Sequence, residues 1–189
     1  MLEFLNHIDH TLFLFLNGIN NPFFDSVMYR LTKTLVWIPL YLFFLYLIIR
    51  QYNWKTIIIL VLAALMILVS DQLSNLVKDS VQRLRPSHQP GLYVHIVEAY
   101  KGGIYGFYSA HASNTFSVAV FLILLLGRKW YVILPALLWT LFVSYTRIYL
   151  GVHYPGDIFA GWIAGGIIGF LLWKGAAITM EAIRKKTYV

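Results

Sequence analysis

The amino-acid sequence predicts an all-α membrane protein, a polytopic helical bundle of five to six transmembrane helices with amphipathic interfacial helices at its N-terminus. Composition is the first reason. Of the 189 residues, 59% are hydrophobic and only 12% are charged, whereas a soluble domain carries about 25% charged residues. Segment length is the second reason, because several apolar runs approach the roughly 20 residues that a spanning helix requires. The mean hydropathy of +0.68 agrees with both.

The first 33 residues are predicted to lie on the membrane rather than to cross it. The apolar run 11–16 is too short to span, and residues 17–22 (NGINNP) break it. Residues 23–31 then have the pattern of a second short helix, so we expect an amphipathic region over residues 1–33. A sixth span in this region is the alternative.

Residues 34–175 are predicted to form the transmembrane domain. Four apolar segments have the length of spans, and a fifth begins with polar residues before it becomes apolar at Phe116. In chain order, the five spans are expected at residues 34–50, 55–77, 110–127, 130–149 and 156–174. Residues 176–189 carry several basic side chains and are expected to form a cytoplasmic tail.

Lysine and arginine in the short loops predict which side faces the cytoplasm. If five helices alternate, one side carries most of the loop cations: Arg50, Lys55, Arg128, Lys129, Lys174, Arg184, Lys185 and Lys186. The other side holds the loop 78–109 and the turn 148–155, which also contain cations. This departure from the positive-inside pattern is explained if those cations bind an anion. The loop 78–109 is therefore expected on the side opposite the cytoplasm. The small size and compact loops of the chain suggest a bacterial inner-membrane protein, in which that side is the periplasm.

Charge and cysteine content exclude several classes of protein. The net charge of +7 comes from basic residues scattered between apolar segments, so no continuous basic face is available for nucleic acid. Without cysteine, disulfides and thiolate metal sites are excluded. The N-terminus lacks a basic region followed by a small-residue cleavage site, so no cleaved signal peptide is expected.

A polar stripe marks the outer end of the second expected span. Six polar residues recur at helical spacings and are predicted to share one face: Asp71, Ser74, Asn75, Lys78, Gln82 and Arg85. A polar face on a membrane helix is expected to line the bundle interior or a water-filled cavity. Asp71, which lies deeper in the span, is expected to neutralise Lys78 or to orient it.

Further polar groups stand at the outer ends of the later spans. Ser109 precedes an apolar run and is expected to cap a helix, whose first N–H groups form an anion site. His111 projects from the same first turn, and Arg147 ends another span. Asp157 follows His153 by four residues, where a carboxylate fixes the imidazole tautomer and raises its basicity.

These groups are expected to meet at one level, because helix ends joined by outer loops lie on the same side of a bundle. The three cations Lys78, Arg85 and Arg147, together with helix-end N–H groups, suit a phosphate dianion. They suit still better a transition state whose charge is spread over three equatorial oxygens. One histidine can act as nucleophile and the other as general acid to the leaving oxygen.

The spacing of these residues resembles that of the type 2 phosphatidic acid phosphatases, a family of lipid phosphate phosphatases with the motifs KxxxxxxRP, PSGH and SRxxxxxHxxxD. The first motif is complete at residues 78–86 (KDSVQRLRP). The second appears at residues 108–111 as YSAH, and the third at residues 146–157 as TRIYLGVHYPGD, with threonine for serine. Ala110 stands where the family has glycine, and alanine fits there only if its φ stays negative.

The resemblance implies a role for each matching residue. His153 would be the nucleophile that forms a phosphohistidine intermediate, Asp157 would orient it, and His111 would protonate the leaving oxygen. The residues implied to hold the phosphoryl oxygens are Lys78, Arg85, Ser109 and Arg147. The family requires no metal, so neither a metal nor another cofactor is expected.

The predicted function is therefore an integral membrane phosphatase that hydrolyses a lipid phosphate or diphosphate at the periplasmic interface. The family implies undecaprenyl diphosphate, phosphatidylglycerophosphate, phosphatidic acid and lipid A phosphates as candidate substrates. Among these we favour an envelope isoprenoid or a lipid A phosphate.

Two alternatives belong to other classes. An anion transporter or channel with a basic vestibule would explain the cations, but it would not need a His153–Asp157 pair and a separate His111. A metalloenzyme or haem protein would use the histidines as ligands. Two histidines are too few for this purpose, and the neighbouring cations would repel a divalent metal.

Small residues on the last expected span predict close helix packing. Gly161, Gly165 and Gly169 recur every four residues, and such a stripe lets two helix backbones approach. Ser113 and Ser117 on the third expected span are predicted to serve the same purpose.

Overall fold

The computed structural model describes residues 2–187 of the chain, and within them the fold is all-α as predicted. The α-helices, in chain order, are α1 (Leu2–Gly18), α2 (Pro22–Leu31), α3 (Ile38–Tyr52), α4 (Thr56–Val81), α5 (Ala110–Leu125), α6 (Trp130–Tyr149) and α7 (Pro155–Thr187). Three short 3-10 helices lie between the α-helices of residues 2–187. They are η1 (Thr34–Trp37), η2 (Asn53–Lys55) and η3 (Pro86–His88). Residues 2–187 contain no β-strand, and an isolated antiparallel bridge joins Leu84 to Tyr105.

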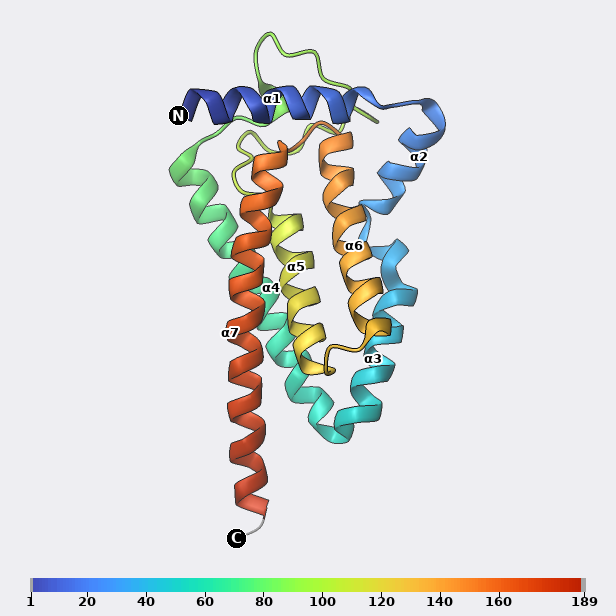
Figure 1. Ribbon diagram of the computed structural model, residues 1–189, viewed down its shortest axis with the longest axis vertical. Coiled ribbons are helices and arrows are strands. Elements are labelled where there is room, and N and C mark those ends of the chain that lie inside the picture. The colour runs from blue at the N-terminus through green and yellow to red at the C-terminus, as the bar shows by residue number, and fades with distance from the viewer. Residues whose placement is uncertain (1, 188–189) are drawn as a thin grey trace.

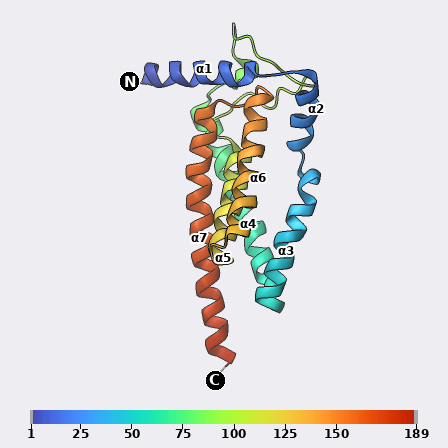
Figure 2. The same cartoon turned by 45° about the vertical axis from the view of Figure 1, so that its right-hand side comes forward.

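The N-terminal helix lies across one end of the bundle, whereas the later helices run along its length. Figures 1 and 2 show α1 crosswise above the ends of α6 and α7, on the same side as the loop 82–109. The turn between α1 and α2 is set by Asn21, whose side chain accepts a hydrogen bond from the Phe24 N–H, and by Pro22 in the first turn of α2. The loops expected on one side of the membrane therefore do share one end of the molecule.

Among residues 2–187, three stretches are long and apolar enough to cross a membrane: Thr34–Val81, Trp130–Tyr149 and Pro155–Ala182. The first contains both α3 and α4, which η2 separates. Helix α5 is apolar but shorter than these stretches. The five expected spans correspond in position to α3, α4, α5, α6 and α7. Helix α7 continues to Thr187, so the region expected as a basic tail extends the last helix as far as the described residues reach.

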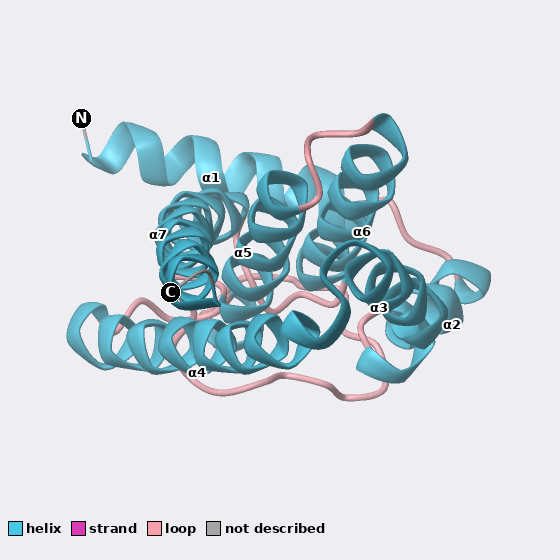
Figure 3. Ribbon diagram, turned by 90° about the horizontal axis from the view of Figure 1, so that it is seen from below, coloured by secondary structure: helices cyan, strands magenta, loops and turns pink. Residues whose placement is uncertain are grey.

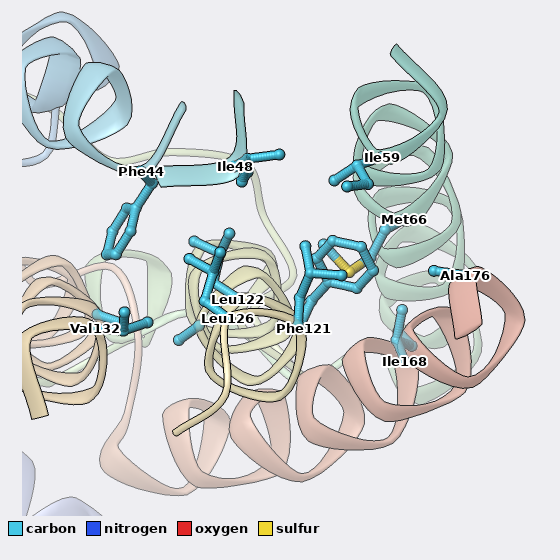
Figure 4. Close-up of a cluster of buried hydrophobic side chains, with 13 residues drawn as sticks. Phe44, Ile48, Ile59, Met66, Phe121, Leu122, Leu126, Val132, Ile168 and Ala176 are labelled. Atoms are coloured by element: carbon cyan, nitrogen blue, oxygen red, sulfur yellow. The ribbon is translucent and has the colours of Figure 1, made fainter. Parts of the chain in front are cut away.

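Helix α5 occupies the centre of the bundle and packs against α4, α6 and α7 (Figure 3). Its buried residues lie on all sides rather than on one stripe, as expected for a helix surrounded by others. The apolar core around it gathers side chains from α3, α4, α5, α6 and α7 (Figure 4), among them Phe44, Ile59, Phe121, Val132 and Ile168. This core fills the half of the bundle away from α1, and two smaller apolar clusters, around Phe13 and around Tyr149, lie at the other end among the polar side chains.

The glycine stripe on α7 brings two helix backbones into direct contact, which confirms the packing prediction. A Cβ added at Gly165 would lie 2.3 Å from the carbonyl oxygen of Ser113, and one at Gly169 would lie 2.4 Å from that of Ser117. Because the obstacle is backbone, no side-chain rotation relieves it. Ser113 also bridges to α4, since its hydroxyl lies 2.7 Å from that of Ser70.

Replacing Gly165 by alanine is expected to lower the free energy of unfolding by about 1–3 kcal/mol, because the added methyl group forces α5 and α7 apart. Gly175→Ala is the matched control in the same helix, since nothing lies within 4 Å of its added Cβ. Thermal unfolding in detergent, followed by circular dichroism, measures both. Equal melting temperatures for the two variants would show that the close contact between Gly165 and the Ser113 backbone does not contribute to stability.

Candidate active site

The end of α4 differs from the sequence prediction. One helical face was expected to continue from Asp71 to Arg85, but α4 ends at Val81 and Gln82 adopts a left-handed conformation with φ of 52°. The following residues are extended, because the N–H of Arg85 donates to the carbonyl of Ile104 and Pro86 disfavours a helical residue before it. Lys78 is therefore in the last turn of α4, whereas Arg85 reaches the site from a loop.

The start of α5 presents the second group of predicted residues. Ser109 is the N-cap of α5, and its hydroxyl oxygen accepts the Ala112 N–H over 3.4 Å. The Ser109 N–H donates to the main-chain carbonyl of Asp157, which ties this cap to α7. Ala110 is the first residue of the helix, so its φ is negative and alanine replaces glycine here without strain. The His111 side chain is exposed.

The turn between α6 and α7 places the third group. Gly151 has φ of 73°, and a Cβ there would lie 2.4 Å from the side chain of Val94, so this turn requires glycine. His153 lies in the turn and is 2% exposed. Pro155 opens α7, as its position predicted, and Asp157 follows in the first turn of the helix with no exposed surface.

His153 and Asp157 form the contact that the four-residue spacing predicted. The Nδ1 atom of His153 lies 3.3 Å from Oδ2 of Asp157, and the same oxygen accepts the Tyr154 N–H over 3.0 Å. Because a carboxylate only accepts, the hydrogen of the imidazole is on Nδ1 and the Nε2 lone pair is free. Burial, and then the charges of Arg85, Arg147 and Lys78, hold the pKa of His153 well below its usual value. The ring is therefore a neutral base at neutral pH.

Arg83 is a member of the site that the sequence analysis did not assign to it. Its guanidinium donates to Oδ1 of Asp157 and to Oδ2 of Asp9, each over 2.7 Å. Burial alone would lower the pKa of Arg83, but the two carboxylates raise it, so the side chain stays charged. Asp9 also accepts the N–H of Gly156 over 2.7 Å. Helix α1 is thereby connected to the histidine through Asp9, Arg83 and Asp157.

Arg147 is held by two residues that its motif does not contain. Its Nη1 donates to the hydroxyl of Thr32 over 2.6 Å, and its Nη2 donates to the hydroxyl of Tyr100 over 3.0 Å. Arg147 is 2% exposed, and its buried Nε has no hydrogen-bond partner among residues 2–187. A guanidinium has five N–H donors, so donors remain for an anion. Neither Thr32 nor Tyr100 could be found from spacing, because they are 115 and 47 residues away.

The cations Lys78, Arg85 and Arg147 influence the two histidines of the site, His111 and His153. Beyond the effect of burial, the charges of Lys78, Arg85 and Arg147 all lower the pKa of His153. Arg85 lies beside His153 and Asp157, because a Cβ added at Gly106 would be within 3.5 Å of all three side chains. Arg85 is fixed by its Nε, which donates to the carbonyl of Tyr105 over 3.1 Å. Of the seven residues that the sequence analysis assigned to the site, Arg85, Ser109, His153 and Asp157 are joined by close contacts, and the charges of Lys78 and Arg147 act on both His153 and His111.

Within residues 2–187, no three histidine, aspartate or glutamate side chains come together in a way that could hold a metal ion. The site combines the buried neutral imidazole of His153, the imidazole of His111 and, beside the Arg83–Asp157 ion pair, the cations Lys78, Arg85 and Arg147. This arrangement can bind an anion of charge −2 and offer it a nucleophile and a proton donor.

Comparison with known proteins agrees with this chemistry. The model of the PAP2 superfamily matches residues 54–179, which include all three motifs. The chain is 44% identical over 178 residues to the lipid A 4'-phosphatase of Bacteroides thetaiotaomicron, with 92% of this chain and 79% of that protein covered. It is 35% identical over 182 residues to the lipid A 4'-phosphatase of Porphyromonas gingivalis, with 92% and 75% covered.

A solved structure shares the fold. The transmembrane PAP2 type phosphatidylglycerolphosphate phosphatase from Bacillus subtilis superposes with a TM-score of 0.68 and 20% identity, over 93% of this chain and 87% of that chain. The family model and the two related phosphatases, together with the membrane-spanning helices, lead to one conclusion. The chain belongs to the PAP2 superfamily and is a membrane-embedded lipid phosphatase.

Proposed function

We propose that this protein removes the 4'-phosphate of lipid A through a phosphohistidine intermediate, at the periplasmic face of the inner membrane. The substrate is inferred from the two lipid A 4'-phosphatases, since each match covers most of both chains. The observation that carries the mechanism is the buried His153, with Asp157 at its Nδ1 and the charges of Lys78, Arg85 and Arg147 acting on its ring.

In the first step, Nε2 of His153 attacks phosphorus. A P–N bond forms while the P–O bond to the lipid breaks, and His111 gives a proton to the leaving oxygen. Lys78, Arg85 and Arg147, with the N–H groups at the start of α5, hold the three equatorial oxygens as charge spreads over them. Asp157 stabilises the positive charge that develops on the His153 ring.

In the second step, water attacks the phosphohistidine. His111, now neutral, takes a proton from the water, the P–N bond breaks, and inorganic phosphate leaves with His153 restored. The burial of His153 limits access of water to the ring until the lipid alcohol has left.

Phosphate release from a panel of lipids tests this proposal. The protein, purified in detergent with EDTA, is given lipid A, undecaprenyl diphosphate, phosphatidylglycerophosphate and phosphatidic acid. We expect the highest kcat/KM on lipid A, turnover that persists in EDTA, and inhibition by vanadate, which mimics the five-coordinate phosphorus. Turnover that requires added metal would contradict the phosphohistidine mechanism. Anion flux in liposomes without hydrolysis would favour a channel instead.

Cysteine labelling tests the periplasmic placement, and the absence of natural cysteine makes it direct. Tyr93 is 96% exposed in the loop 82–109, and Trp130 is 76% exposed at the opposite end of the bundle. In spheroplasts, we expect a membrane-impermeant maleimide to label Tyr93→Cys at once and Trp130→Cys only after detergent is added. The opposite pattern would place the site in the cytoplasm.

Asp9→Asn is expected to lower kcat roughly tenfold with little change in KM, because a charge-assisted hydrogen bond to Arg83 is weakened and Asp157 loses support. Glu3→Gln is the matched control, since Glu3 is an exposed acidic residue on the same helix. Steady-state kinetics on one lipid substrate compares the two. If both variants have the activity of the parent, α1 does not support the catalytic pair.

A further inference from the structure

Tyr100, in the loop 82–109, meets the guanidinium of Arg147 with both its ring and its hydroxyl. The Cζ atom of Arg147 lies 5.3 Å from the centre of the Tyr100 ring, and Nη2 donates to the hydroxyl oxygen over 3.0 Å. Because this hydrogen bond uses a lone pair of the phenol, the O–H hydrogen of Tyr100 is left for another acceptor. Holding Arg147 therefore uses the oxygen of Tyr100 but not its hydrogen.

The segment 100–102 also reaches a second cation of the site. A Cβ added at Gly102 would lie 2.6 Å from Nη1 of Arg85, so the backbone of this segment passes directly beside that guanidinium. Arg85 is the cation that lies beside His153. One short stretch of the outer loop therefore contacts the guanidinium groups of both Arg85 and Arg147, which are two of the three cations assigned to the phosphate.

The backbone that leads into Tyr100 is strained. Glu98 and Ala99 both have φ of 53°, in the left-handed region, although neither is glycine. Such a residue costs roughly 1 kcal/mol or more, and both side chains are exposed, so neither gains burial in return. The strain is explained by the placement of the next residue. Tyr100 packs against an apolar cluster beside the turn that carries His153, formed by Val97, Tyr149, Leu150 and Val152.

We propose that Tyr100 is a further substrate-binding residue, whose hydroxyl donates a hydrogen bond to a phosphoryl oxygen beside Arg147. An oxygen bound to the second hydrogen of Nη2 would lie about 5 Å from the Tyr100 oxygen, so a neighbouring oxygen of the same phosphate is within reach of the hydroxyl. The donor then assists Arg147 as charge spreads over the equatorial oxygens. The inference rests on the proposed function, because it assigns Tyr100 to the phosphate that His153 attacks.

The two guanidinium groups also change the acidity of the phenol. Burial alone would raise the pKa of Tyr100, but the charge of Arg147, its hydrogen bond and the charge of Arg85 lower it. The proton is therefore lost at a lower pH than from an ordinary tyrosine. The phenolate that remains cannot donate, and its charge repels a phosphate dianion, so Tyr100 stops binding the substrate as the pH rises through its pKa. The other titratable groups on the elements around Tyr100 are Asp25, Tyr29, His95, Lys101, Tyr145 and Tyr149.

Tyr100→Phe, which keeps the ring and removes the hydroxyl, tests the role of this donor. We expect kcat/KM on lipid A to fall roughly 30-fold or more, because one donor to the charged oxygens is lost, and we expect inhibition by vanadate to weaken. Tyr93→Phe is the matched control, since Tyr93 is 96% exposed in the same loop, and it should equal the parent. Unchanged kinetics in Tyr100→Phe would overturn the inference.

Thr32→Val separates substrate binding by Tyr100 from support of Arg147. This variant removes the other hydroxyl that accepts a hydrogen bond from Arg147, so it weakens the support of the guanidinium without removing a donor to phosphate. We expect a much smaller loss of kcat/KM than in Tyr100→Phe. Equal losses in the two variants would reduce Tyr100 to a support for Arg147 and would overturn its assignment to the substrate.

Replacement of Tyr100 by 3-fluorotyrosine, through amber suppression, keeps the hydroxyl and the packing but makes the phenol more acidic. We expect activity at neutral pH to be retained, whereas the alkaline limb of the kcat/KM profile moves to lower pH. Titration of Lys78 or of another tyrosine would leave that limb in place. A limb at the same pH in both proteins would contradict the inference, because a phenolate would hold Arg147 at least as well as a phenol does.

The outcomes for Tyr100 and for the proposed function are distinct. Normal turnover by the parent protein, with no loss in Tyr100→Phe, overturns the role of Tyr100 alone. Failure of the parent to release phosphate from any lipid of the panel overturns the proposed function and the role of Tyr100 together. If the parent prefers another lipid to lipid A, Tyr100→Phe must show the same loss on that lipid, because Tyr100 binds the phosphate; an undiminished rate there would overturn the inference.

Discussion

His153→Asn is expected to reduce turnover roughly 10⁵- to 10⁶-fold, while the protein stays folded. The asparagine amide keeps an N–H close to the position of Nδ1, so the hydrogen bond to Asp157 survives. It has no counterpart of Nε2, so no P–N bond can form. The loss is therefore a loss of the nucleophile and not of the pocket, and binding of phosphate or vanadate should persist.

Trapping of the intermediate measures this result directly. After brief reaction with a ³²P-labelled lipid phosphate, the parent protein should carry an acid-labile, alkali-stable phosphoryl group that is absent from His153→Asn. His88→Asn is the matched control, because it makes the same change in the outer loop, where His88 contacts Ser87. Substantial turnover in His153→Asn, or labelling that persists in it, would place the nucleophile elsewhere.

Asp157→Asn is expected to lower kcat by roughly 10⁴-fold, as loss of an orienting carboxylate can. The carboxylate of Asp157 accepts from Arg83, His153 and the Tyr154 N–H, whereas an amide offers only one acceptor oxygen. If that oxygen faces His153, the amide NH₂ group faces the Arg83 guanidinium, donor against donor. If it faces Arg83, the imidazole is held in the wrong tautomer. The first arrangement loses the Arg83 hydrogen bond that holds residue 157 in place. The second removes the free lone pair at Nε2 of His153.

The kinetic and structural effects of Asp157→Asn can be separated by measuring kcat and the melting temperature on the same preparation. We expect the protein to fold with a lowered melting temperature and to lose nearly all turnover. A variant that is destabilised but turns over normally would reduce Asp157 to a structural role. Glu98→Gln in the outer loop, where the side chain is exposed, serves as the control for the loss of one carboxylate.

The chemistry of the site could be predicted because its residues belong to short, local patterns. The spacing from His153 to Asp157 is one helical turn, and it produced the observed contact of 3.3 Å. Ser109 before an apolar run predicted a helix cap, and the cap is present. The glycine stripe on α7 predicted close packing with another helix, because four-residue spacing on a helix depends only on helical geometry.

The same local reasoning went wrong where a tertiary contact interrupted the helix. The polar stripe was extended to Gln82 and Arg85 on the assumption that α4 continued, but the chain turns at Gln82 and pairs with the loop near Tyr105. Arg85 still reaches the site, though from an extended segment. A periodic pattern cannot show where a helix is ended by hydrogen bonds to a distant part of the chain.

The sequence by itself determined the all-α membrane fold, the three motifs and the residues that would bind and attack a phosphate, because each depends on composition or on spacing within a few turns of chain. Only the tertiary structure decided what supports those residues. Arg83 meets an aspartate 74 residues before it and another 74 residues after it, and Arg147 meets Thr32 across 115 residues. Contacts at such separations arise when helices pack, and packing depends on the shape of the whole bundle rather than on any one segment.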